Sequence, residues 1–150
     1  MPRVIAHLLQ RILILMNETK EDSIFTKIIH GDIPCHKIYE DEKTIAFLDI
    51  YPVQTGQVVI ATKVQVANFI DLNPEDSAAL WYTINLVGAK LRAVFPLKKR
   101  IGVMIEGLEV DHAHAKLFPI DTGDEFRAEP PTSEPDHEAL AVLAKKLMIY

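Results

Sequence analysis

Polar and apolar residues alternate along several short segments of the chain, which is the repeat expected of β-strands with two different faces. Many β-branched side chains strengthen the assignment at 57–61, and glycine, proline or acidic residues separate the segments. The predicted strands are 36–40, 43–49, 57–61, 100–106 and 110–120. The first two flank an Asp-Glu pair and therefore predict a hairpin.

A helical repeat replaces this alternation in the middle of the chain. Asn73 precedes Pro74 and two acidic residues, the common order of capping side chain, first-turn proline and favourable charge. Apolar residues then recur every three or four positions as far as Pro96, which predicts one long helix. Its aromatic residues, Trp81 and Tyr82, are expected in the core or at an interface. Shorter helices are predicted at 23–30, 63–72 and 136–147.

The order of these elements predicts an α+β fold with about five antiparallel strands, one long helix and one or more short helices. No strand leads into a glycine-rich phosphate loop, so the dinucleotide and P-loop fingerprints are absent. The proline-containing segment 129–135 predicts a linker. The expected organisation is an N-terminal amphipathic extension (1–22), a domain (23–128), and a linker with a C-terminal helix (129–150).

Composition narrows the function classes. The 150 residues carry a net charge of −5, which argues against nucleic-acid binding, because such domains usually present a basic surface. A single cysteine, Cys35, excludes an internal disulfide framework and fits a reducing, cytoplasmic location. Residues 1–16 have helical amphipathic spacing but are too few to span a bilayer. Organelle targeting, an added packing helix and translation from Met16 all stay open for this segment.

The segment 110–119 carries the most distinctive chemistry. In an extended chain His112, His114 and Lys116 share one face, each about 6.6 Å from the next, while alanines and a leucine occupy the other. Burying three such groups together without partners would cost several kcal/mol. We therefore expect a cleft or a bound anion on this face.

Three segments together resemble the histidine triad (HIT) family of nucleotide hydrolases and transferases. The stretch 23–34 resembles that family's opening helix, and 46–60 resembles its nucleoside-binding hairpin. The stretch 112–119 matches the motif in which histidines alternate with apolar residues, here His-Ala-His-Ala-Lys. All three occur in the family's order.

The resemblance implies catalytic roles for the motif. His114 would be the nucleophile that attacks the α-phosphorus of a nucleotide, and a neutral imidazole is a good nucleophile near pH 7. His112 and Lys116 would stabilise charge on the phosphoryl oxygens. The resemblance also implies a purine nucleotide substrate, no cofactor, and a homodimer formed across the long helix and an edge strand.

A nucleotide pocket is implied in the same way. Asp49 matches the ribose-binding acid, whose carboxylate accepts hydrogen bonds from both hydroxyls. Phe25, Phe47 and Ile50 match the apolar walls of the base pocket. Without the resemblance, an acid that ends a strand is more typical of a turn, and a phenylalanine beside it of a core.

Departures from the family pattern change what is expected. Lys116 replaces the third histidine, so phosphate binding is retained while acid–base catalysis at that position is weakened. Ser23 and Thr26 replace two cysteines of the zinc-containing members, and Gln57 stands where a histidine is often found. No metal site is therefore predicted.

Three functions fit these residues. The favoured one is an enzyme, a hydrolase or transferase that cleaves a nucleotidyl P–N or phosphoanhydride bond through a covalent nucleotidyl-histidine intermediate. The second is a non-catalytic nucleotide-binding protein that retains the pocket. The third is a metal site on His112 and His114, against which the opposite orientation of Asp111 and the ammonium of Lys116 both argue.

Overall fold

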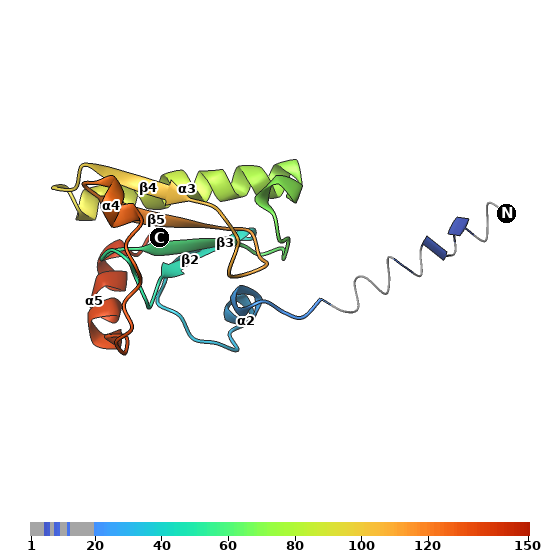
Figure 1. The fold of residues 1–150 in the computed structure, drawn as a ribbon, viewed down its shortest axis with the longest axis horizontal. Coiled ribbons are helices and arrows are strands. Elements are labelled where there is room, and N and C mark those ends of the chain that lie inside the picture. The colour runs from blue at the N-terminus through green and yellow to red at the C-terminus, as the bar shows by residue number, and fades with distance from the viewer. Residues whose placement is uncertain (1–4, 7, 10–11, 13–19) are drawn as a thin grey trace.

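The computed structural model describes residues 5–6, 8–9, 12 and 20–150. In this part of the chain the elements, in order, are α2 (Ile24–His30), β1 (Lys37–Glu40), β2 (Thr44–Leu48), β3 (Val58–Thr62), η1 (Phe69–Asp71), α3 (Pro74–Val94), β4 (Arg100–Met104), β5 (His114–Ile120), α4 (Gly123–Phe126) and α5 (His137–Leu147). The strands form an antiparallel sheet in the order β1-β2-β3-β5-β4 (Figure 1). The predicted α+β class is confirmed.

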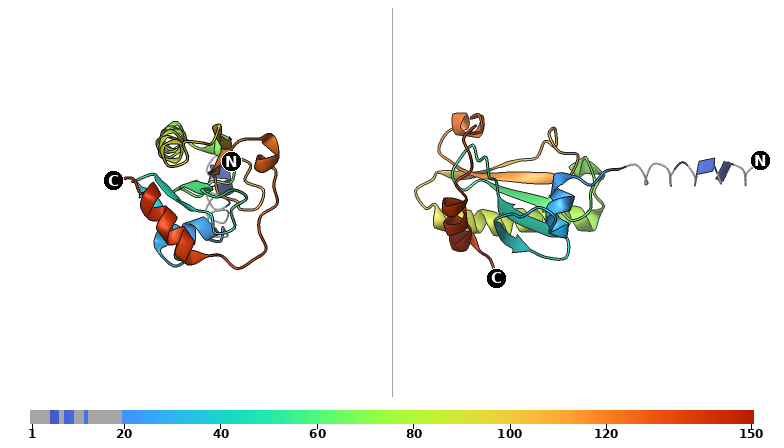
Figure 2. Two further views of the ribbon diagram at one scale, coloured as in Figure 1. Left: turned by 90° about the vertical axis from the view of Figure 1, so that its left-hand side faces the viewer. Right: turned by 90° about the horizontal axis from the view of Figure 1, so that it is seen from below.

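Different helices cover the two faces of the sheet. Figure 1 shows α3 running along the strands and α5 lying steeply across one end of them, and Figure 2 gives the views from the side and from below. The larger core lies under these two helices, where Leu80 and Leu91 of α3 and Leu147 of α5 join buried residues of the strands. The smaller core lies on the opposite face and includes Phe25 from α2 and Phe47 from β2.

The predicted division of residues 112–117 between two faces is confirmed. Ala113, Ala115 and Leu117 belong to the core under α3. On the other face, His114 pairs with Ala61 of β3, which belongs to the smaller core. The small alanines let α3 lie close to the sheet, while the opposite face carries the reactive groups.

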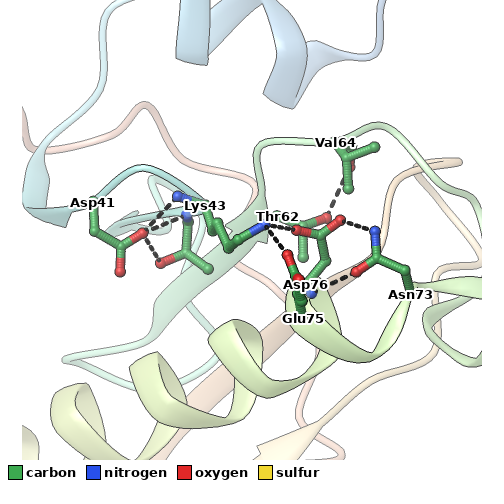
Figure 3. Close-up of polar contacts among 8 residues, drawn as sticks. Asp41, Lys43, Thr62, Val64, Asn73, Glu75 and Asp76 are labelled. Atoms are coloured by element: carbon green, nitrogen blue, oxygen red, sulfur yellow. Dashed lines mark hydrogen bonds and ion pairs between the residues drawn. The ribbon is translucent and has the colours of Figure 1, made fainter.

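A polar cluster anchors the start of α3 to the β1–β2 turn (Figure 3). The Asn73 side chain accepts from the backbone N–H of Asp76 at 2.8 Å and donates to its carboxylate at 2.7 Å. Lys43 donates to the other oxygen of Asp76 at 2.8 Å. Asp41 closes the turn by accepting from the backbone N–H groups of Lys43 and Thr44. We call Asp41, Lys43, Asn73 and Asp76 the α3 anchor cluster.

The predicted helix at 63–72 is wrong. Only the short 3₁₀ turn η1 forms there, because the backbone of this segment bonds to distant residues instead of to itself. Lys63 N–H donates to the Lys43 carbonyl at 2.7 Å, and the Val66 carbonyl accepts from Ala113 N–H at 2.6 Å. These long-range bonds keep the segment extended.

Several element boundaries also differ from the predictions. β4 ends at Met104 and β5 begins at His114, since a turn that joins His112 N–H to the Val110 carbonyl precedes β5. The short helix α4 was not predicted, although Thr122 and Glu125 form a capping box at its start. Trp81 and Tyr82 lie outside the core, with 47% and 61% of their surface exposed.

Much of the predicted N-terminal extension lies outside the described residues. The residues described there, Ile5, Ala6, Leu8, Leu9 and Ile12, are helical and exposed. In the portion of the chain that the structure covers, every helix is either too short or too polar to cross a membrane.

Candidate active site

His112 lies just before β5 and is completely buried. Its Nε2 is 2.6 Å from the Thr62 carbonyl oxygen, which can only accept, so Nε2 carries a proton. Burial lowers the pKa of His112 below its ordinary value of 6.5, so the ring is neutral at pH 7. Its Nδ1 is then an acceptor, and the Ser23 hydroxyl lies 2.6 Å from it. Both ring nitrogens are therefore engaged by the protein.

His114 is held in the opposite tautomer. Its Nδ1 lies 2.6 Å from the His112 carbonyl oxygen and must donate, so Nε2 has no proton. Burial lowers the pKa of His114, and the charge of Lys116 acts in the same direction. In the part of the chain that the structure describes, no buried side-chain nitrogen or oxygen lacks a partner. Among the described residues none forms a hydrogen bond with Nε2, so this basic nitrogen keeps its lone pair in a side chain that is almost fully buried.

Lys116 occupies the same face two residues further along β5. It is half-buried, and its Nζ lies 3.2 Å from a carboxylate oxygen of Glu106. Val59 of β3 and Met104 of β4 flank it in the sheet. The structure thus brings a cation beside His114, but this cation is already ion-paired. Sequence reasoning missed Glu106, since no local pattern relates it to Lys116.

Asp49 follows β2 and is held by two hydrogen bonds. One carboxylate oxygen accepts from Tyr51 N–H and the other from the Gln57 side-chain amide, each at 2.8 Å. Gln57 is itself buried, and its carbonyl oxygen accepts from Val53 N–H at 2.7 Å. Gln57 is thus a positioning residue for Asp49 and lies away from the opening helix. The side chain that contacts Ser23 and Thr26, the two positions compared with zinc-binding cysteines, is Gln65.

Asp49 and Lys116 line one groove of about 570 Å³. Its other walls include side chains that sequence reasoning did not predict, namely Gln57, Glu106, Glu109, Phe126 and Arg127. His114 lines a smaller adjoining cavity of about 80 Å³, and Glu106 borders both. The structure thus brings Asp49 and Lys116 to one groove, while His114 lines a separate cavity that shares only Glu106 with it among the described residues.

The predicted base-pocket residues are not gathered around this groove. Phe25 and Phe47 are buried against each other, with ring centroids 5.8 Å apart. Phe25 also packs edge-on against His114 at 4.8 Å. Ile50 is partly exposed and lines a different groove, between the β2–β3 connection and α5. Phe25 thus packs between Phe47 and the rings of His112 and His114.

The hydroxyls at Ser23 and Thr26 do not fit a zinc ion. Zinc in proteins is held by thiolate, imidazole or carboxylate groups. Here the Thr26 hydroxyl donates to the Gln65 side-chain oxygen at 2.6 Å, and Ser23 contacts His112. Gln65, rather than Gln57, completes this arrangement. We call Ser23, Gln65, His112 and His114 the histidine cluster, with Thr26 at its edge.

Known proteins share both the sequence pattern and the fold. The HIT domain profile matches residues 30–123, more than half of the chain. Protein hit of Bacillus subtilis is 33% identical over 116 residues, which cover 72% of this chain and 78% of that protein. Adenosine 5′-monophosphoramidase hnt1 of Schizosaccharomyces pombe is 33% identical over 99 residues, covering 64% of this chain and 72% of that protein.

A solved structure agrees with these sequence matches. The crystal structure of a HIT-like protein involved in cell-cycle regulation from Bartonella henselae superposes with a TM-score of 0.74 at 26% identity. The match covers 85% of this chain and 95% of that protein. Together with the histidine motif at the start of β5, these matches show that the chain belongs to the HIT family.

Proposed function

We propose that this chain is a nucleotide hydrolase or transferase that cleaves a nucleotidyl P–N or phosphoanhydride bond through a covalent intermediate on His114. The observation that carries the proposal is the 2.6 Å hydrogen bond from His114 Nδ1 to the His112 carbonyl. This bond leaves Nε2 with its lone pair, in a ring that burial keeps neutral. A neutral nucleophile beside a cation is the arrangement that nucleophilic phosphoryl transfer needs.

The reaction proceeds in two displacements. Nε2 of His114 attacks the α-phosphorus, a P–N bond to the imidazole forms, and the bond to the leaving group breaks with its electron pair. A departing amine takes a proton from solvent. Water then attacks the phosphorus and loses a proton, and the P–Nε2 bond breaks to release the nucleoside monophosphate and neutral His114. Lys116 stabilises charge on the phosphoryl oxygens in both steps.

Asp49 is proposed to bind the ribose. Its two oxygens each accept one hydrogen bond from the protein, and each keeps a further lone pair for a hydroxyl. Because Asp49 and Lys116 line the same groove, one purine nucleotide would contact both. In this proposal Phe25 packs against the ring of His114 and Phe47 packs against Phe25. Ile50 takes no part in binding the base, because it lines a different groove.

The identity of the leaving group is addressed by a substrate panel. The phosphoramidase name of the fission yeast relative supports a P–N bond. Glu106 lines both the groove of Asp49 and the cavity of His114, and a carboxylate there favours a departing amine over a departing anion. We expect adenosine phosphoramidate to be cleaved faster than a dinucleoside polyphosphate or a nucleotidyl sugar.

Replacement of His114 by Asn tests the proposal directly. We expect kcat to fall by at least about a thousandfold, because the variant has no nucleophile. Brief incubation of the wild type with labelled substrate, followed by denaturation, should trap a nucleotidyl-protein that the variant does not form. Replacement of the exposed His137 by Asn is the matched control and should leave both readouts unchanged. Unchanged turnover in the His114 variant would rule the assignment out.

A binding protein without catalysis is the second candidate, and the Lys116–Glu106 ion pair favours it. A cation that is already neutralised at 3.2 Å stabilises developing charge less than a free one. Nucleoside monophosphate binding that weakens in an Asp49→Asn variant, with no hydrolysis of any panel substrate, would establish this function instead. The metal site on His112 and His114 is not proposed, since both nitrogens of His112 are engaged.

We also propose that the chain forms a homodimer through α3 and the edge strand β4. A groove of about 620 Å³ lies between them, lined by Gly88 of α3 and by Ile101 and Val103 of β4. Trp81 projects from α3 with 47% of its surface exposed, and a second subunit would cover it. Light scattering at micromolar concentration should give twice the chain mass, and a Trp81→Glu variant should give the monomer mass. A monomeric wild type would exclude the dimer.

A further inference from the structure

The directions of the hydrogen bonds around Ser23 can be assigned atom by atom. The Thr26 hydroxyl has one proton and is 2.6 Å from the Gln65 side-chain oxygen, which also accepts from Ser23 N–H at 2.9 Å. The Ser23 oxygen accepts from Thr26 N–H at 3.0 Å and so caps α2. Its own proton has two acceptors within reach, Nδ1 of His112 at 2.6 Å and the Thr26 hydroxyl oxygen at 3.3 Å, and the shorter contact is the one to His112.

Hydrogen bonds of His112 connect Ser23 to His114 in series. The Ser23 hydroxyl donates to His112 Nδ1, and His112 Nε2–H donates to the Thr62 carbonyl. The His112 carbonyl in turn accepts from His114 Nδ1–H at 2.6 Å. The tautomer of each imidazole is therefore decided by the partner of its other nitrogen. The hydroxyl of Ser23 donates the first hydrogen bond of this series.

We propose that Ser23 is a positioning residue, whose hydroxyl holds His112 in the Nε2–H tautomer and so keeps the carbonyl that orients His114 in place. Ser23 lies 89 residues from His112 and connects α2 to the start of β5. Without its proton, Nδ1 of His112 would be a buried acceptor with no donor, and the ring would turn or take the other tautomer. Either change releases the Thr62 bond and moves the His112 carbonyl.

A set of variants separates this role from helix capping. Ser23→Ala removes both the cap and the donor, Ser23→Asp keeps an acceptor for the cap but has no proton to donate, and Ser23→Thr keeps both. Thr26→Val is the matched control, because it removes a neighbouring hydroxyl whose proton goes to Gln65 at 2.6 Å and whose oxygen is only at 3.3 Å from Ser23 Oγ and 3.5 Å from His112 Nδ1. Thermal unfolding checks that each variant is folded.

The readouts are ring ¹⁵N chemical shifts of both histidines and steady-state kinetics with adenosine phosphoramidate. We expect kcat to fall about tenfold in the Ala and Asp variants with KM within about twofold of wild type, as for other residues that orient a reacting group. In Ser23→Asp, Nδ1 of His112 should become protonated. Ser23→Thr and Thr26→Val should match the wild type in both readouts.

The kinetic part of this inference rests on the proposed function, and the two can fail separately. If no nucleotide is hydrolysed but the Ala and Asp variants shift the ring signals of His112 and His114, the hydrogen-bond assignment stands and the proposed function fails. If the wild type is active and the Ala and Asp variants keep its kcat, Ser23 has no positioning role. Unchanged ring signals in both variants overturn the inference by themselves.

Discussion

The α3 anchor cluster and the histidine cluster lie in different parts of the fold and are built from similar groups. Each connects a helix start to a distant loop or strand end, and each contains a helix N-cap, Asn73 in one and Ser23 in the other. In the anchor cluster Lys43 and Asp76 neutralise each other at 2.8 Å (Figure 3). In the histidine cluster the imidazoles are neutral. The last hydrogen bond is donated by Nδ1 of His114, and Nε2 of the same ring has no partner among the described residues.

The two clusters obey the same hydrogen-bonding rules and differ in whether the last group of the network has a partner. A buried polar group is costly unless it is paired, so both clusters pair their interior atoms. The anchor cluster closes on itself as an ion pair. In the histidine cluster each hydrogen bond determines which nitrogen of the next ring carries its proton, and Nε2 of His114 is left without a partner among the described residues.

The largest expected difference in activity between the two regions comes from replacing Lys116, beside the histidine cluster, or Lys43, within the anchor cluster, by methionine. Lys116→Met should lower kcat/KM for adenosine phosphoramidate about a hundredfold, because it removes the cation that stabilises the phosphoryl oxygens. Lys43→Met, in the anchor cluster, should leave kcat/KM unchanged. Steady-state kinetics on both purified variants measures the contrast. Equal losses would mean that Lys116 acts only through the fold.

At the anchor cluster we expect a smaller effect, on stability and not on activity. Asn73→Ala removes the α3 cap and should lower the free energy of unfolding by about 1 kcal/mol, with kcat unchanged. Urea unfolding provides the measurement. Asn85→Ala is the matched control, since Asn85 lies within α3 and bonds only to the Trp81 carbonyl in the described structure. A loss of activity in folded Asn73→Ala would contradict the division between the clusters.

The smallest expected effect is a change in acid stability. Burial lowers the pKa of both His112 and His114 below their ordinary value of 6.5. Below pH 6.5 the unfolded chain binds protons that the folded chain does not, so the stability contributed by these groups is present above that pH and is lost as pH falls towards the folded pKa values. Unfolding by urea between pH 7 and pH 5 should show this decline.

A His114→Gln variant sharpens the pH experiment. It removes one of the two buried imidazoles, so its stability should fall less steeply with acidification than that of the wild type. Asn85→Gln, at an exposed position of α3 that has no titratable group, serves as the control and should keep the wild-type slope. An identical slope in all three proteins would show that the buried histidines do not govern the decline.

Local sequence patterns were sufficient for most of the fold. The alternation around β5 correctly divided His114 from Ala113 and Ala115, because neighbouring side chains in a strand must point to opposite faces. The cap, proline and spacing at 73–96 located α3 for similar local reasons. The helix predicted at 63–72 failed because its backbone is bonded to residues 43 and 113, which local periodicity does not register.

Some residues of the candidate site could be predicted from the sequence, and others could not. Its histidines, Lys116 and Asp49 were identified by residue type and by resemblance to the HIT family. Glu106 and Gln65 were missed, because each acts through a contact outside its own segment. The sequence did not indicate the partner of Ser23, because a serine hydroxyl can form a hydrogen bond with any nearby acceptor.

The amino-acid sequence was enough to identify the elements, the two-faced strand and the residue types capable of phosphoryl chemistry, since these depend on spacings of two to four residues. The proton of His114 lies on the nitrogen that faces a carbonyl two residues away, but for His112 tertiary structure alone decided which nitrogen carries the proton. That choice depends on Thr62, 50 residues from His112, and on Ser23, 89 residues from it. Only folding brings these groups within hydrogen-bonding distance, and their directions leave His114 Nε2 free.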